Sequence, residues 1–246
     1  YWLDEAYAVP GVHIDVGSAS RTIKNWLGAS HLLDALGVDR GAKCVDFGSG
    51  SGLFARLMRD VGYNFVAHDK YTEPRLCNYF VTDSLANANV ISAFEVFEHL
   101  PDPKQTLHEI FNVNANFILF TTWFCDDKDD DWIYYLPECG QHVFFYSENA
   151  MRDFARQYGY EMTISHFFII LAKSDRISDE QRKLIFNFSL TSMNDVRGRA
   201  VDRLDGVIMG NDHIDRDLAY ARSRFECERE QENANARVGQ NESDRR

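Results

Sequence analysis

The chain has 246 residues, of which 45% are hydrophobic and 26% charged. A chain of this size can bury a sizeable core and fits one domain with an appendage. The formal net charge of −12 disfavours a large nucleic-acid footprint, because neutralising phosphates needs clustered Lys and Arg. Its five cysteines are scattered without a C-x-x-C pair, so neither a zinc ribbon nor a disulfide framework is indicated. The cysteines are best interpreted as reduced thiols, so we expect a cytoplasmic protein. We also see no signal peptide and no apolar run long enough to span a bilayer.

In chain order, helical patterns alternate with short apolar runs. Apolar residues at helical spacing predict helices over 20–36, 53–61, 103–111 and 147–158. Apolar runs of strand length predict strands over 43–47, 64–68, 90–94, 117–122, 161–165 and 167–172. This alternation predicts an α/β, Rossmann-like, doubly wound sheet that is mostly parallel. The last two strands are nearly adjacent in sequence, so we expect them to form an antiparallel C-terminal hairpin.

The composition also predicts the division of the chain. We expect an N-terminal helical cap or lid at 1–40 and the Rossmann-like core at 41–173. Residues 174–232 predict a helical extension that packs on the core or joins two copies into a homo-oligomer. Residues 233–246 are polar and low in aromatics, which favours a disordered tail.

The most informative run is the glycine turn, which we define as Gly48-Ser49-Gly50-Ser51-Gly52. Alternate glycines allow a tight turn and a close approach of the backbone to a ligand. The dinucleotide pattern G-x-G-x-x-G would place glycine at position 53, which is Leu53 here. The turn therefore disfavours a nicotinamide-dependent oxidoreductase. It suits a ligand without phosphate, such as S-adenosylmethionine (SAM), whose carboxylate would meet backbone N–H groups and whose ammonium would lie near Asp46.

A second acidic residue follows the next predicted strand. Asp69 stands where a carboxylate can hold the two hydroxyls of a ribose, because its two oxygens match a vicinal diol. A glycine turn and this acid in register on one βαβ unit predict a nucleoside site more strongly than either does alone.

Three blocks then resemble the class I SAM-dependent methyltransferases, in particular the ubiquinone-biosynthesis O-methyltransferase branch, whose members are often encoded near glycan-assembly genes. They are VDFGSGSGLF at 45–54, FEVFEHLPDP at 94–103 and GQHVFFYS at 140–147. The resemblance implies SAM as cofactor. It implies that the following residues hold that cofactor: Asp46, Gly48, Ser49, Gly50, Gly52, Asp69, Lys70, Asp83, Phe94 and Glu95. The third strand of the family, before Asp83, is poorly defined here.

The acceptor side is less specific. A hydroxyl acceptor needs a base or a metal, and His99 and His142 are the base candidates. The residues Glu95, Glu98, His99 and His142 also resemble the two glutamates and two histidines that bind a divalent metal in small-RNA 2′-O-methyltransferases. Loop capping by the same residues is the favoured interpretation, so a metal is not our first expectation.

We therefore expect O-methylation of a small molecule or glycan intermediate by SAM. One alternative is an RNA 2′-O-methyltransferase, which the acidic charge disfavours. Another is a non-catalytic, methyltransferase-like scaffold subunit recruited through the charged C-terminal helices.

Overall fold

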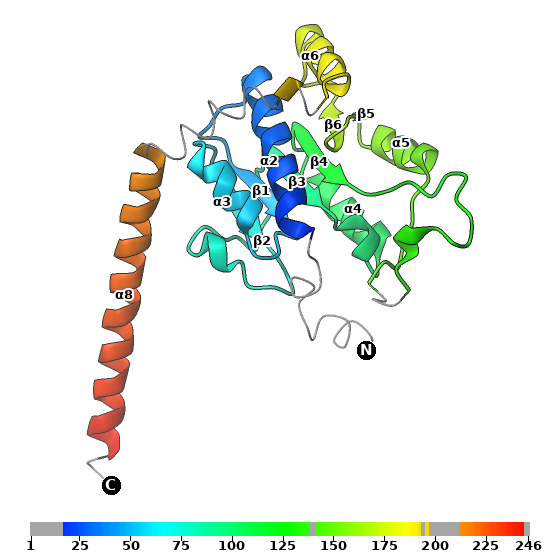
Figure 1. Ribbon diagram of the computed structural model, residues 1–246. Helices are drawn as coiled ribbons and strands as arrows, with labels where there is room; N and C mark the ends of the chain where they lie inside the picture. The colour runs from blue at the N-terminus through cyan, green and yellow to red at the C-terminus, as the bar shows by residue number, and fades with distance from the viewer. Residues whose placement is uncertain (1–16, 138–140, 193–194, 197–211, 244–246) are drawn as a thin grey trace.

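The computed structural model describes residues 17–137, 141–192, 195–196 and 212–243. Its centre is a six-stranded sheet in the order β2-β1-β3-β4-β6-β5. Strands β2, β1, β3 and β4 are parallel, β6 is antiparallel to β4, and β5 is antiparallel to β6. The predicted doubly wound sheet with its antiparallel C-terminal hairpin is confirmed (Figure 1). The strands are Cys44–Phe47 (β1), Phe65–His68 (β2), Val90–Phe94 (β3), Phe117–Thr121 (β4), Tyr160–Ile164 (β5) and Ile169–Lys173 (β6).

Helices cover both faces of the sheet because successive strand residues point to opposite sides. Cys44, Val90 and Phe117 belong to one apolar cluster, which is completed by helices α2 (Ser18–Ala35), α3 (Leu53–Asp60) and α6 (Asp179–Ser189). Their neighbours Val45 and Ile91 belong to a second cluster with α4 (Pro103–Asn112) and α5 (Glu148–Gln157). Continuous apolar strands, buried on both faces, are what a parallel sheet requires.

Two helix starts follow from their capping residues. Asp102 accepts a hydrogen bond from Gln105 N at 3.0 Å before Pro103 opens α4, and Ser147 accepts one from Ala150 N at 3.2 Å before α5. Both side chains satisfy a backbone donor that the first turn leaves unpaired. Both helices therefore begin as the sequence predicts.

Helix α2 differs from its prediction. It begins at Ser18 after Gly17 and not at a Ser20 cap, and no side chain caps it. Its own residues Leu32 and Leu33 are fully buried. Helix α2, which lies in the segment predicted as a cap or lid, is therefore packed into the core. The expected lid aromatics at positions 1, 2 and 7 lie outside the described residues.

The third strand of the predicted family pattern is reduced to a single bridge. Val81 pairs in parallel with Ala67 of β2, and Ala67 N donates to Phe80 O at 2.8 Å. The chain therefore reaches the outer edge of β2 without forming a regular strand there, in agreement with the weak sequence signal.

The C-terminal extension is helical. Ser178 and Gln181 form a capping box at the start of α6. Helix α8 runs from Asp212 to Ser243, and its later part projects beyond the rest of the chain (Figure 1). The helix includes 233–243, which the sequence predicted to be disordered, and 244–246 lie outside the described residues.

Within the described ranges, no helix is long and apolar enough to cross a membrane.

Candidate active site

The glycine turn joins β1 to α3 at the carboxyl edge of the sheet, where β2 and β3 lie on either side of β1. Ligands of open α/β sheets bind at such a reversal of strand order. Gly48, Gly50 and Gly52 all have positive φ, of 68°, 53° and 80°. A Cβ on Gly48 would lie 2.5 Å from Val96 Cγ2, whereas a Cβ on Gly50 would meet nothing within 4 Å. A Cβ on Gly52 would lie 2.8 Å from Cys77 Cβ, so the turn is packed at both ends and open at Gly50.

Several N–H groups of the turn have partners within the protein. Gly48 N and Ser49 N donate to His68 O at 2.8 and 3.2 Å, and Gly52 N donates to Ser49 O at 2.9 Å. A contact between N–H groups of the turn and a ligand carboxylate stays a prediction. The side chain of Ser49 is a further donor, because its buried Oγ has no hydrogen-bond partner among the described residues.

Asp46 lies beneath the turn at 3% exposure and accepts a hydrogen bond from Ser92 Oγ at 2.7 Å. The pKa of Asp46 is raised to about 7, mainly by burial and also by the nearby charge of Asp69, against the opposing hydrogen bond from Ser92. A buried carboxyl with this pKa ionises most readily when a cation binds beside it. Asp46 thus fits a positively charged ligand group.

Asp69 lies against the glycine turn. Its Oδ2 accepts from Gly50 N at 2.8 Å, and its Oδ1 accepts from Tyr71 N and Thr72 N at 2.8 and 2.7 Å. The sequence predicted this proximity between the acid and the turn. Each carboxylate oxygen can accept two hydrogen bonds, so these contacts fix the side chain, fill Oδ1 and leave one acceptor site, on Oδ2, for a ligand.

A pocket of about 440 Å³, which we call the cofactor pocket, extends outward from Asp69. Its size lies in the range of small-molecule sites. Asp83, predicted near the adenine, lines the same pocket, whereas Lys70 is exposed, does not line it and lies over the Tyr71 ring. The other lining residues are Ala67, Thr72, Glu73, Pro74, Asn78, Tyr79, Val81, Thr82 and Glu228.

The end of β3 leads from the glycine turn toward the predicted acceptor side. Phe94 packs edge-on against Phe54 at 4.8 Å between ring centroids and contacts Phe168, so it is largely part of the core. Glu95 adopts a φ of 55°, and its N–H donates to Thr121 Oγ1 at 2.7 Å. A left-handed non-glycine residue persists only where its surroundings hold it, and such residues concentrate at functional sites.

Three of the four predicted metal ligands come together. Glu98, His99 and His142, the histidine cluster, have ligand atoms within 4.8 Å of one another, and Glu95 does not belong to this group. Glu98 is fully buried, and its Oε1 accepts from Tyr134 OH at 2.7 Å. Burial raises the pKa of Glu98 to about 7, with a further increase from the charge of Glu95.

The two histidines differ in environment. Burial and the neighbouring His142 lower the pKa of His99 to about 4, so His99 is neutral at neutral pH. His142 Nδ1 lies 2.6 Å from Tyr134 O. A carbonyl only accepts, so Nδ1 carries the proton and Nε2 of the neutral ring carries a lone pair. His142 is therefore oriented to accept a proton or to ligate a cation through Nε2.

Aromatic side chains surround this cluster. Tyr134 stacks on Trp123 with ring centroids 5.0 Å apart and contacts Trp132 at 5.2 Å. Trp123 is 54% exposed whereas Tyr134 is buried, so the group has an open apolar face beside a buried polar centre. Such a surface suits a planar or ring-shaped acceptor.

Sequence reasoning missed several of these residues. Ser92 interrupts the apolar strand β3, a polar position that signals a buried partner, and that partner is Asp46. Glu228 carried no local signal, because it reaches the cofactor pocket through the packing of α8, where it accepts a hydrogen bond from the lining residue Tyr79.

Comparison with known proteins agrees with this geometry. A family model described as a methyltransferase domain matches residues 19–164, which begin within α2. No protein of curated function matches the chain in sequence.

Among solved structures, magnesium protoporphyrin IX methyltransferase from Synechocystis with bound S-adenosylhomocysteine is 15% identical over 66% of this chain and 86% of its own, with a TM-score of 0.46. Human N-acetylserotonin methyltransferase in complex with SAM is 16% identical over 59% of this chain and 51% of its own, with a TM-score of 0.44. At these identities and TM-scores the likenesses carry no conclusion about substrate.

Proposed function

This chain belongs to the methyltransferase domain family, and from that premise we propose that it transfers a methyl group from SAM to an oxygen of a small molecule or glycan intermediate. SAM is the methyl donor of class I enzymes of this kind. The observation that supports the proposal most directly is the bond between Asp69 and Gly50 N, which ties an acceptor for ribose hydroxyls to an open glycine turn.

The residues present fit each part of the cofactor. Asp46 is buried, and its carboxyl suits the ammonium group of the methionine end. The buried Ser49 Oγ, which has no hydrogen-bond partner among the described residues, suits the carboxylate of the same end. Asp69 suits the ribose hydroxyls and Asp83 the adenine, since both line the cofactor pocket. The bound cofactor supplies an electrophilic methyl carbon, and the protein contributes orientation and exclusion of water.

On the acceptor side we assign proton removal to His142, supported by His99. The lone pair on His142 Nε2 follows from the bond between Nδ1 and Tyr134 O. Glu98 and Tyr134 hold this region together, because Val143 N donates to Glu98 O at 2.8 Å while Tyr134 OH binds the Glu98 carboxyl. A positioned base of this kind typically contributes a 10²- to 10⁴-fold rate increase.

Calorimetric titration with S-adenosylhomocysteine tests the cofactor assignment. We expect the parent chain to bind and Asp69→Ala to bind at least tenfold more weakly, because the variant loses acceptors for the ribose and the brace on Gly50. Asp153→Ala, which removes an exposed carboxylate paired with Arg156, is the matched control and should bind normally. Absence of heat with a folded parent chain would favour the scaffold alternative.

A divalent cation in the histidine cluster is the second candidate, because Glu98, His99 and His142 offer three donor atoms close together. Glu and His donors suit Zn²⁺ or Mn²⁺. A cation that serves the reaction should raise Tm of the parent chain and not of His142→Ala, and chelator should reduce methyl transfer. Unchanged transfer after chelator treatment would leave the histidines as bases.

The acceptor class is tested by competition between two kinds of substrate. With radiolabelled SAM, we expect label in small hydroxylated or glycan acceptors and no retention of short RNA on a filter. RNA methylated at a ribose oxygen would instead establish the RNA 2′-O-methyltransferase alternative. The assignment to the ubiquinone-biosynthesis branch stays a prediction, which the identity of the acceptor would test. The cytoplasmic location also stays a prediction.

A further inference from the structure

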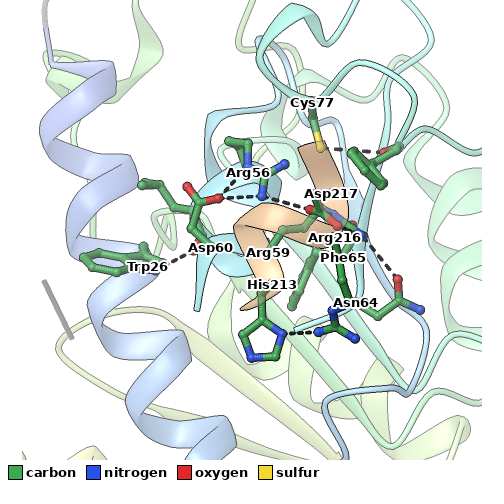
Figure 2. Close-up of polar contacts among 12 residues, drawn as sticks. Trp26, Arg56, Arg59, Asp60, Asn64, Phe65, Cys77, His213, Arg216 and Asp217 are labelled. Carbon is green, nitrogen blue, oxygen red and sulfur yellow. Dashed lines mark hydrogen bonds and ion pairs between the residues drawn. The ribbon is translucent and has the colours of Figure 1, made fainter. Parts of the chain in front are cut away.

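A largely buried carboxylate ties the first turns of helix α8 to the core. Asp217 accepts hydrogen bonds from Arg59 Nε at 2.6 Å and from Arg59 Nη2 at 2.7 Å, and a third from Arg56 Nη2 at 2.9 Å (Figure 2). The Asp217 and Arg59 side chains are only 14% and 12% exposed. A two-pronged pair of this kind fixes orientation as well as distance.

The same arginine joins α8 to the chain that forms the cofactor pocket. The Arg59 guanidinium lies over the Phe80 ring at 3.7 Å from its centroid, and Phe80 contacts Tyr220 of α8 with ring centroids 5.3 Å apart. Phe80 O in turn accepts from Ala67 N of β2. The segment before Asp83 is thus held between β2 on one side and α8 on the other.

Farther along α8, Glu228 enters the cofactor pocket itself. It lines the pocket together with Asp69 and Asp83, and its Oε2 accepts from Tyr79 OH at 2.9 Å. Tyr79 has a φ of 69°, an uncommon conformation for a non-glycine residue that the contacts around it must hold. The pocket therefore has a wall that comes from the C-terminal helix, outside the matched residues 19–164.

We propose that α8 closes the adenine end of the cofactor pocket and that Glu228 binds the exocyclic amine of the base. This inference rests on the proposed function. With the ribose at Asp69, beside the glycine turn, the base occupies the part of the pocket lined by Tyr79, Asp83 and Glu228. The adenine amine has two hydrogens, which match the two carboxylates, and the Glu228 oxygens accept more than the single bond from Tyr79.

The experiment compares two ligands that differ only at the exocyclic amine of the base. S-Adenosylhomocysteine carries the amine, whereas its purine analogue carries a hydrogen atom at that position and keeps the same ring nitrogens. We expect Glu228→Ala to weaken binding of the adenosyl ligand about tenfold, as for the loss of a hydrogen bond to a charged group, and to change binding of the purine analogue less than twofold. Glu228→Gln keeps an acceptor oxygen and should restore part of the discrimination.

The matched control is Glu226→Ala, which removes an exposed carboxylate of α8 that does not line the pocket and should change neither affinity. Unchanged binding of the adenosyl ligand by Glu228→Ala overturns the inference, and so does equal weakening of both ligands, which a merely structural role would produce. A folded parent chain that binds neither ligand overturns the proposed function itself, which separates the two failures.

Discussion

The cofactor pocket and the histidine cluster lie at the same edge of the sheet but are built differently. Beside the first, beneath the glycine turn, Asp46 is buried and bonded to Ser92, and in the second, Glu98 is buried and bonded to Tyr134. Burial raises the pKa of both carboxyls to about 7. Asp46 stands in β1, shortly before a turn of contiguous residues with open space at Gly50, whereas Tyr134, the partner of Glu98, comes from a distant segment and is surrounded by aromatic rings. Similar carboxyl chemistry therefore serves ligand binding in one region and side-chain positioning in the other.

A packing contact between Gly48 and Val96 joins the glycine turn to the region of the histidine cluster. Gly48, in the turn, approaches Val96, and Val96 directly precedes the short η3 turn Phe97–His99 that carries the histidine cluster. We expect a substitution at this contact to affect both regions. A substitution elsewhere in one region should change the function of that region alone.

The largest effect is expected for Gly48→Ala. The new Cβ would lie 2.5 Å from Val96 Cγ2 on a residue with a φ of 68°, so we expect a loss of roughly 2–4 kcal/mol in the free energy of unfolding. Binding of S-adenosylhomocysteine should fall at least about 100-fold. Denaturant unfolding and calorimetry measure the two effects. Gly37→Ala, with a similar φ of 65° and no atom within 4 Å of the new Cβ, is the control for backbone strain alone.

A change in the histidine cluster should separate the regions. We expect His142→Ala to reduce methyl transfer about 100-fold, because a positioned base is lost, and to leave binding of S-adenosylhomocysteine within twofold. Rates with an acceptor that the parent chain methylates, together with calorimetry, test this. His166→Ala removes an exposed histidine elsewhere and should change neither quantity. A loss of cofactor affinity in His142→Ala would mean that the two regions are not separable.

Acidification should weaken cofactor binding through protonation of Asp46. Its pKa is raised to about 7, and the ammonium of the ligand stabilises the ionised form, so binding requires loss of a proton below pH 7. Affinity for S-adenosylhomocysteine should fall by up to about tenfold per pH unit between pH 7 and 5. Affinity for 5′-methylthioadenosine, which lacks the amino group, should stay nearly constant. If the affinity for both ligands were equally independent of pH, the proposed contact between Asp46 and the ammonium would be wrong.

The smallest effect concerns the α8 attachment. Burial alone would raise the pKa of Asp217, but the hydrogen bonds and charges of Arg59 and Arg56 outweigh it, and the pKa is lowered. The attachment is therefore complete above the unfolded pKa of about 4 and is lost as pH falls through the lower folded value. Asp217→Asn should speed hydrogen exchange in the first turns of α8. It should also weaken binding of S-adenosylhomocysteine several-fold at pH 7. Asp215→Asn, on the same turn but exposed, is the comparison that should show neither change.

Much of the fold was predictable because its elements are local. A continuous apolar run predicted β3 at 90–94, where the structure has it, and Asp102 and Ser147 predicted the starts of α4 and α5. One prediction was wrong at the start of α2. Ser20 does not cap this helix, because the helix begins earlier, at Ser18.

The amino-acid sequence by itself determined the cofactor half of the site. A strand, a glycine turn, a helix and a second strand ending at Asp69 are contiguous, so the chain geometry alone brings Asp69 to Gly50. Only the tertiary structure decided that Tyr134 binds Glu98, that His142 joins His99, and that Glu228 reaches the cofactor pocket from α8. These side chains come from segments far apart along the chain, and their meeting depends on how helices and loops pack against one sheet, which no local pattern encodes.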